Sequence, residues 1–216
     1  MTKLPADYPA LAFVDIETTG SQFERDRITE IGIKSLNNGE VREWERLINP
    51  LVYIPQNIQR LTGISPQMVS EKPSFEELAT EIKQELEGKI FIAHNARFDY
   101  GFLKASFKRV GIDFKPKVLC TVKLSRLLFP NQVRHNLDTI IQSHCLKVRA
   151  RHRALGDADV LHQFGHRLKK SARVAFHALV NHLPEEFFDF VNYFVIVVAH
   201  QSVLTVRLQI SQVHLL

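Results

Sequence analysis

Leu11-Ala-Phe-Val-Asp-Ile-Glu-Thr-Thr-Gly20 is the stretch on which the fold of this chain depends. Its apolar start predicts a buried strand, and Thr-Thr-Gly predicts the turn that ends the strand. Asp15 and Glu17 are two residues apart, so both carboxylates should lie on one face of the strand. Capping of the following turn would explain one acid but not both. Two buried neighbouring carboxylates require a cation, and oxygen ligands suit Mg²⁺ or Mn²⁺.

The rest of the sequence predicts a mixed α/β sheet. Strands 28–36 and 41–48 are joined by Asn37-Asn38-Gly39, a hairpin signal, so the chain begins with a three-stranded meander. Beyond it strands and helices alternate, which predicts helices packed against the sheet. A capping box at Ser74-Phe-Glu-Glu77 starts the first of these helices. The further expected elements are strands 89–94 and 118–120 and helices 74–87, 98–110, 121–128, 137–145 and 154–179.

Three more candidates lie near the starts of expected helices. Asp99 follows the strand 89–94, at the edge where open α/β sheets place their ligands. His152 lies in a loop that leads into the helix 154–179, and Asp157 lies near the start of that helix. Taken singly, each acid could simply favour the first turn of its helix. Asp159 serves as a local comparison, because a solvated helical position is its ordinary role.

Charge is distributed unevenly along the chain. Residues 101–180 hold 16 Lys and Arg against four Asp and Glu, a net charge of +12, whereas the whole chain carries +5. Such a basic half is typical of proteins that bind polyanions, although a solvated helical surface explains it equally well. The stretch Lys147–Arg153 could steer phosphates or form a surface loop. Two cysteines without a CxxC pair and no leader in residues 1–9 predict a cytoplasmic protein without a membrane anchor.

Three segments occur in order along the chain: Asp15-Ile-Glu-Thr-Thr-Gly20, His94-Asn-Ala-Arg-Phe-Asp99 and His152-Arg-Ala-Leu-Gly-Asp157. Together they resemble the motifs of the DEDDh (DnaQ-like) 3′–5′ exonuclease family, to which the proofreading subunit of DNA polymerase III belongs. The spacing from His152 to Asp157 is that of the histidine subfamily. The resemblance covers roughly residues 10–170. It implies a ribonuclease H-like fold, a mixed five-stranded sheet flanked by helices.

The resemblance also assigns roles to these residues. Two divalent ions, Mg²⁺ or Mn²⁺, would bind among Asp15, Glu17, Asp99 and Asp157. Asp15 would bridge both ions, Glu17 and Asp157 would complete the coordination of the first, and Asp99 would support the second. His152 would be the general base for the attacking water, so activity should fall at acidic pH, where imidazole is protonated.

Further residues are carried over for substrate binding. The resemblance implies that Ile16, Thr18 and Phe98 line the pocket for the terminal nucleotide, with Phe98 packed against a base. Thr62, in Thr62-Gly-Ile64, would flank the 3′ end. Simple core packing is the alternative for Phe98, since an aromatic residue near a strand end often completes a core.

The function implied is a metal-dependent 3′-to-5′ exonuclease that releases nucleoside monophosphates from the 3′ end of single-stranded DNA, in proofreading or repair. An exoribonuclease of the same family would use identical residues, so the motifs leave DNA and RNA both open. A non-catalytic nucleic-acid-binding module is disfavoured because all five catalytic residues are present. A DNA polymerase or a fused repair domain is the expected partner, and the sequence does not indicate an oligomeric state.

The sequence divides into an exonuclease domain, residues 1–182, and a C-terminal tail, residues 183–216. The tail contains an apolar segment, 187–199, that is too short and too interrupted to span a bilayer. Residues 204–211 alternate between apolar and polar as strands do. An extra strand, an oligomer contact and the beginning of a fused domain are equally compatible with this pattern.

Overall fold

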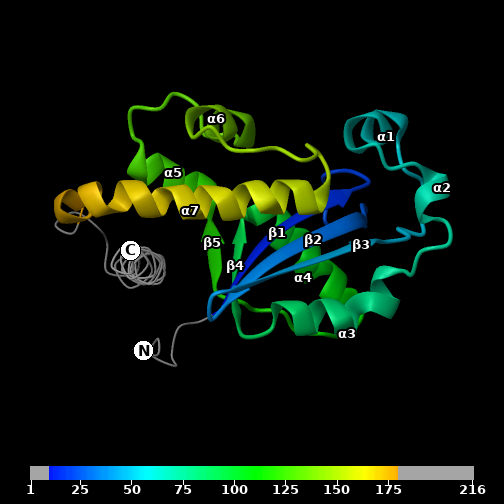
Figure 1. Cartoon of the computed structure of the whole chain (residues 1–216). Helices are drawn as coiled ribbons and strands as arrows, with labels where there is room; N and C mark the ends of the chain where they lie inside the picture. The colour runs from blue at the N-terminus through cyan, green and yellow to red at the C-terminus, as the bar shows by residue number, and fades with distance from the viewer. Residues whose placement is uncertain (1–9, 180–216) are drawn as a thin grey trace, which may run out of the picture. The chain divides into compact units, whose positions relative to one another are not determined.

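The computed structural model describes residues 10–179, with side chains described for residues 10–168. They form a five-stranded sheet of order β3-β2-β1-β4-β5. β1 with β2 and β2 with β3 are antiparallel, whereas β1 with β4 and β4 with β5 are parallel. The expected mixed five-stranded sheet flanked by helices is therefore confirmed (Figure 1). The strands are β1 (Ala10–Thr18), β2 (Ile28–Asn37), β3 (Glu40–Leu47), β4 (Lys89–Ala93) and β5 (Val118–Cys120). The helices are α1 (Gln56–Thr62), α2 (Pro66–Val69), α3 (Phe75–Leu86), α4 (Arg97–Arg109), α5 (Thr121–Leu128), α6 (Leu137–Ser143) and α7 (Ala154–Leu179).

Strand β1 separates an apolar face of the sheet from a face that carries the acids. Side chains alternate along a strand, so even and odd positions point to opposite faces. Ala12, Val14 and Ile16 are buried in the core that residues of α3 and α4 also enter. On the opposite face, Phe13 packs edge-on against His162 of α7, with ring centroids 5.3 Å apart. Asp15 and Glu17 share the face of Phe13 and therefore project toward the start of α7.

A buried ion pair attaches α7 to β2. Lys34 Nζ lies 2.5 Å from Asp159 Oδ1 and 2.7 Å from Glu43 Oε1. Asp159 is only 6% exposed, so the expected solvated position for this residue is wrong. The reason is that Lys34, on a strand far away in the sequence, neutralises the carboxylate and makes its burial tolerable.

The capping box predicted for the first long helix is present. The Ser74 side chain accepts a hydrogen bond from the Glu77 backbone N–H, and Glu77 Oε2 accepts one from the Ser74 N–H at 2.7 Å. Two of the amide groups that a helix start leaves unpaired are thereby satisfied. Helix α3 follows directly and ends before Gly88, whose φ of 70° is easily adopted by glycine.

Two short helices, α1 and α2, were not predicted from the sequence. Ile54 and Ile64, which flank α1, pack with Val69 of α2 in a small cluster separate from the main core. Segments of seven and four residues carry too little periodicity to be recognised as helices. The tail 183–216 and its expected boundary lie outside the described residues. Among residues 10–179, no helix is both long and apolar enough to cross a bilayer.

Gly32 of β2 allows α7 to approach the sheet. A Cβ placed on Gly32 would lie 2.2 Å from Leu155 N and 2.4 Å from the Ala154 carbonyl carbon. These are backbone atoms of the first turn of α7 and cannot rotate away. Since Gly32 pairs with Asp15 across the sheet, this close approach also brings the start of α7 to the carboxylates.

We predict that Gly32→Ala lowers the free energy of unfolding by about 3 kcal/mol, the upper range for overpacking. Gly111→Ala is the matched control. Gly111 has a positive φ but open space around its Cα, so only backbone strain of about 1 kcal/mol should result. Urea denaturation in EDTA measures both changes. Equal losses in the two variants would show that the approach of α7 to Gly32 does not limit the fold.

Candidate active site

The four predicted carboxylates come from three elements that meet at one end of the sheet. Asp15 and Glu17 belong to β1, Asp99 lies in the first turn of α4 and Asp157 in the first turn of α7. Since β1 and β4 are parallel, the carboxyl ends of both strands reach the same edge. Asp99 and Asp157 are 3% and 4% exposed. The structure thus brings together acids that are up to 142 positions apart in the sequence.

These acids perturb one another strongly. Burial raises the pKa of Asp15 well above its usual value, and the charges of Asp99, Asp157 and Glu17 raise it further. Burial also raises the pKa of Asp99 to about 8, although the backbone N–H groups of Asp99 and Ile16 oppose the shift. The pKa of Glu17 rises to about 7, first through burial and then through Asp157 and Glu30. Without a cation, such carboxyl groups retain protons near neutral pH.

The arrangement fits a divalent cation. Glu17, His152 and Asp157 each offer a ligand atom, and the three atoms lie within 4.8 Å of one another. Asp157 Oδ1 is buried and has no hydrogen-bond partner among the described residues. A buried carboxylate oxygen without a partner is costly unless a cation occupies the space in front of it. The donor set, mainly carboxylate oxygens, is the kind that Mg²⁺ and Mn²⁺ prefer.

His152 is held by its own backbone beside Asp157. It has a φ of 56°, a conformation that residues other than glycine seldom adopt. Its N–H donates a hydrogen bond of 3.3 Å to Asp157 Oδ2. Strained backbone of this kind persists where the surrounding contacts over-determine it, which is common at functional sites.

The contacts that hold this loop come from Glu30 of β2. Glu30 is fully buried, and Arg153 Nε lies 3.0 Å from each of its carboxylate oxygens. The Ala154 N–H donates to Glu30 Oε2 at 2.9 Å, at the first residue of α7. Because Glu30 pairs with Glu17 across the sheet, it connects the His152 loop to the strand of the acids. Glu30 and Arg153 were not singled out from the sequence, and the basic stretch 147–153 was the signal nearest to them.

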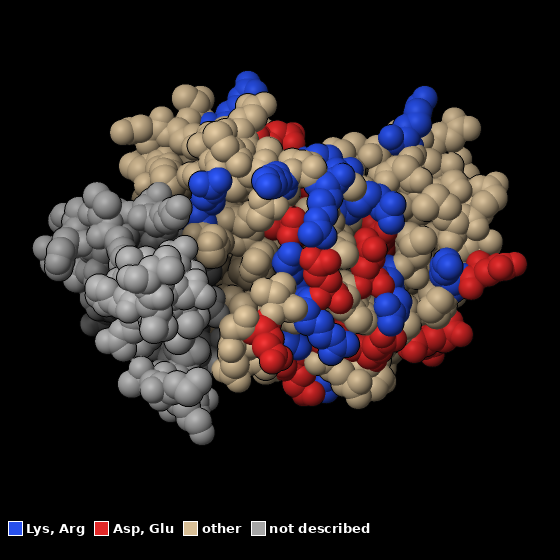
Figure 2. All heavy atoms as spheres, in the orientation of Figure 1, with Lys and Arg blue, Asp and Glu red and all other residues tan. Residues whose placement is uncertain are grey.

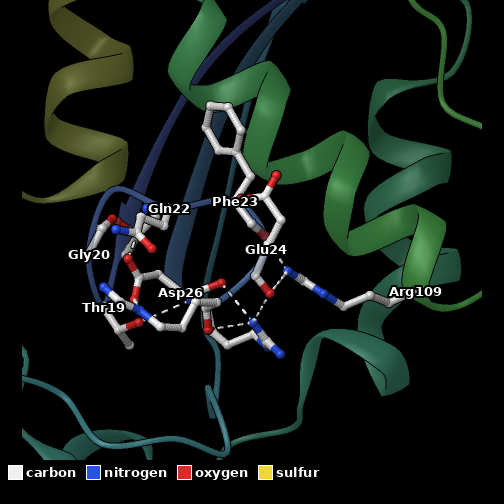
Figure 3. A network of polar contacts seen from close by, with 10 residues as sticks. Thr19, Gly20, Gln22, Phe23, Glu24, Asp26 and Arg109 are labelled. Atoms are coloured by element: carbon white, nitrogen blue, oxygen red, sulfur yellow. Dashed lines mark hydrogen bonds and ion pairs between the residues drawn. The ribbon is translucent and has the colours of Figure 1, made fainter.

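The loop that follows the acids of β1 is closed by a polar network (Figure 3). Asp26 Oδ2 accepts a hydrogen bond from Gln22 N–H at 2.8 Å, and Thr19 Oγ1 accepts one from Arg27 N–H at 3.0 Å. Arg109 of α4 donates to the carbonyl oxygens of Phe23 and Glu24. These hydrogen bonds hold the turn in place beside the end of β1.

The four residues carried over for substrate binding all have structural contacts. Ile16 lies in the core with only 4% of its surface exposed, and its backbone N–H donates a hydrogen bond to the Asp99 carboxylate. Thr18 Oγ1 donates to the Gly20 carbonyl at 2.5 Å. Half-buried Phe98 packs against Phe102, with centroids 4.9 Å apart, as the core-packing alternative expects. Thr62 hydrogen-bonds within its own turn, to the Ile58 carbonyl and from the Ile64 N–H. Contact of these residues with a nucleotide stays a prediction.

The arginines of the basic stretch are engaged in ion pairs. Arg149 lies 3.5 Å from Glu43, Arg151 binds Asp138 and Asp157, and Arg153 binds Glu30. Figure 2 accordingly shows basic and acidic atoms interleaved beside the start of α7, over the region where Figure 1 draws β2 and β3. On this face the basic half of the sequence does not form a continuous positive surface, because the acidic half lies beside it.

Residues 12–163 match the exonuclease family model RNase_T. Among curated relatives, the 3′-5′ exonuclease DinG of Staphylococcus haemolyticus is 37% identical over 153 residues, which cover 70% of this chain and 17% of that protein. The DinG of Staphylococcus epidermidis is 38% identical over 149 residues, or 68% of this chain and 16% of that protein. The chain thus matches about one sixth of the length of these relatives.

Solved structures share the fold. Exonuclease X in complex with 5′ overhanging duplex DNA aligns with a TM-score of 0.58 and 25% identity, over 71% of this chain and 90% of that one. The E. coli exonuclease I complex with single-stranded DNA aligns with a TM-score of 0.68 over 82% of this chain and 43% of that one; at 18% identity it supports the fold alone. Given the family match over residues 12–163, this chain belongs to the RNase_T family of DnaQ-like exonucleases, whose motifs its acids resemble.

Proposed function

We propose that this chain is a metal-dependent 3′-to-5′ exonuclease and that residues 1–182 form its exonuclease domain. The observation that carries the proposal is the convergence of four carboxylates, two buried and two half-buried, and His152 at the carboxyl end of β1. Relatives named 3′-5′ exonuclease support the reaction. Exonuclease X, at 25% identity and in complex with DNA, supports DNA as the substrate.

In the proposed reaction each group of residues has its own role. Asp15, Glu17, Asp99 and Asp157 would hold two divalent ions, which supply positive charge to the phosphodiester and to the attacking and leaving oxygens. The His152 imidazole would take the proton of the attacking water. Glu30 and Arg153 hold the backbone on which His152 sits. The closed loop 19–27 would confine the terminal nucleotide beside Thr18 and Phe98.

RNA is the alternative substrate, because exoribonucleases of the same family would use the same carboxylates. Magnesium as the ion in the cell, two ions rather than one, and a polymerase or fused repair domain as partner stay predictions. The cytoplasmic location and the role of residues 183–216 are likewise predictions.

The first test is digestion of a 5′-labelled single-stranded oligonucleotide, made as DNA and as RNA, with Mg²⁺, Mn²⁺ or EDTA. We expect a ladder that shortens from the 3′ end, faster on DNA, and that EDTA abolishes. Asp15→Asn should lose at least about 1,000-fold in rate, because metal and electrostatic stabilisation are removed together. Asp113→Asn, an exposed acid paired with Lys115, is the control and should retain full activity. No cutting of either substrate with any metal would favour the binding-module alternative.

A second prediction separates a base from a metal ligand at His152. His152→Ala should lower kcat by roughly 100- to 10,000-fold, the usual range for loss of a general base. The dissociation constant for Mn²⁺, measured by calorimetry, should stay within about twofold of that of the unaltered protein if the imidazole only moves a proton. A parallel loss of Mn²⁺ affinity would assign His152 to the metal instead.

A third prediction concerns stability against pH. The raised pKa values of Asp99 and Glu17, about 8 and about 7, mean that the folded protein binds more protons than the unfolded chain from about pH 4 to 8. Stability in EDTA should therefore decrease as the pH rises from 5.5 to 8.5. Scanning calorimetry should show a falling Tm, and Asp99→Asn should flatten the slope. A Tm that rises over this window would contradict the clustering of these acids.

A further inference from the structure

Arg151 bridges two acids at the edge of the site. Its Nη1 binds Asp157 Oδ2, and its Nε lies 2.9 Å from Asp138 Oδ1. The Asp157 side chain is 6% exposed and the Arg151 side chain 24%, whereas that of Asp138 is 66% exposed at the start of α6. The guanidinium thus has one end inside the acidic cluster and the other at the surface.

The two oxygens of Asp157 have different surroundings. Oδ2 accepts hydrogen bonds from the Arg151 guanidinium and the His152 N–H. Oδ1 is buried and has no partner among the described residues. An oxygen already bound to a guanidinium is a poor ligand for a second cation. Asp157 therefore offers a cation one oxygen, and the carboxylate cannot turn to offer both without releasing Arg151.

We propose that Arg151 is the built-in counter-cation of the acidic site: it holds Asp157 through Oδ2 and competes with the divalent cation for the charge of that carboxylate. The inference rests on the proposed function only in taking the carboxylates as a metal site. By this proposal Arg151 keeps metal affinity low and keeps the metal-free cluster folded. Asp138 retains the guanidinium when the cation arrives, because its bond to Nε does not involve Asp157.

The neighbouring arginines do not share this position. Arg149 belongs to the same basic stretch and carries the same charge, but it is 66% exposed and its partner, at 3.5 Å, is Glu43. Arg153 is bound by Glu30, which is not one of the four acids. Among these three arginines, Arg151 alone contacts a predicted metal ligand.

Binding of Mn²⁺ to the full chain, measured by calorimetry at pH 7.5, tests the proposal without nucleic acid. Arg151→Gln should bind Mn²⁺ about tenfold more tightly, because a unit charge a few ångströms away is removed. Asp138→Asn should bind Mn²⁺ more weakly than the unaltered protein, because the guanidinium then pairs with Asp157 alone. Arg149→Gln, the matched control, should stay within twofold.

Thermal melting adds a second readout. In EDTA at pH 8, Arg151→Gln should melt at a lower temperature than the unaltered protein, yet gain more in Tm when Mn²⁺ is added. Unchanged or weaker Mn²⁺ binding by Arg151→Gln would overturn the proposal, and so would equal tightening by Arg149→Gln. If Arg151→Gln does not fold without metal, Arg151→Lys is the second variant, because lysine keeps the charge but loses the planar fork. Its affinity for Mn²⁺ should lie between the affinity of the unaltered protein and the roughly tenfold higher affinity expected for Arg151→Gln. A chain that binds Mn²⁺ in this pattern but cuts no nucleic acid would refute the exonuclease and leave the role of Arg151 intact.

Discussion

Mutual repulsion among four carboxylates, two buried and two half-buried, is the constraint around which this protein is built. Asp15, Glu17, Asp99 and Asp157 lie at one end of the sheet, and the proximity that would let them hold a cation also works against folding without one. The protein lowers this cost with positive groups from its own chain. Backbone N–H groups bond Asp99, and the Arg151 guanidinium bonds Asp157. The site is thus only partly compensated, which leaves charge available for a bound ion.

The central position of β1 makes such an arrangement possible. A strand with neighbours on both sides presents one face to the apolar core and the other to α7, so the acids can project from a rigid and well-buried support. The parallel pairing with β4 brings Asp99 to the same edge. Gly32 then allows the backbone of α7 to come close enough to place Asp157 beside the other three acids. Each of the three elements is needed, because no single element can place four carboxylates around one point.

Ion pairs attach α7 to the sheet at two places, at the start of the helix and within its second turn. Lys34 binds Asp159, two residues beyond Asp157, and Arg153 binds Glu30 at the helix start. Arg149, Arg151 and Arg153, which belong to the basic stretch after residue 100, are likewise all paired with acids of this chain. An excess of basic residues along a sequence is therefore a weak guide to a nucleic-acid surface, since a fold can spend those charges on its own acids. On the face in Figure 2, binding of a strand would depend more on the site itself than on a general positive field.

Most of the fold and the chemistry of the site follow from local sequence patterns. Strand alternation puts Asp15 and Glu17 on one face, the capping box starts α3, and the three motifs indicate the exonuclease family, because each signal is contained within a few neighbouring residues. The pairing of Lys34 with Asp159 and of Glu30 with Arg153 joins residues 125 and 123 positions apart, and no local pattern carries that information. The same holds for Arg151, whose charge is visible in the sequence but whose partners are not. Which acid neutralises which base depends on how the start of α7 packs against β2, and that packing exists only in the folded chain.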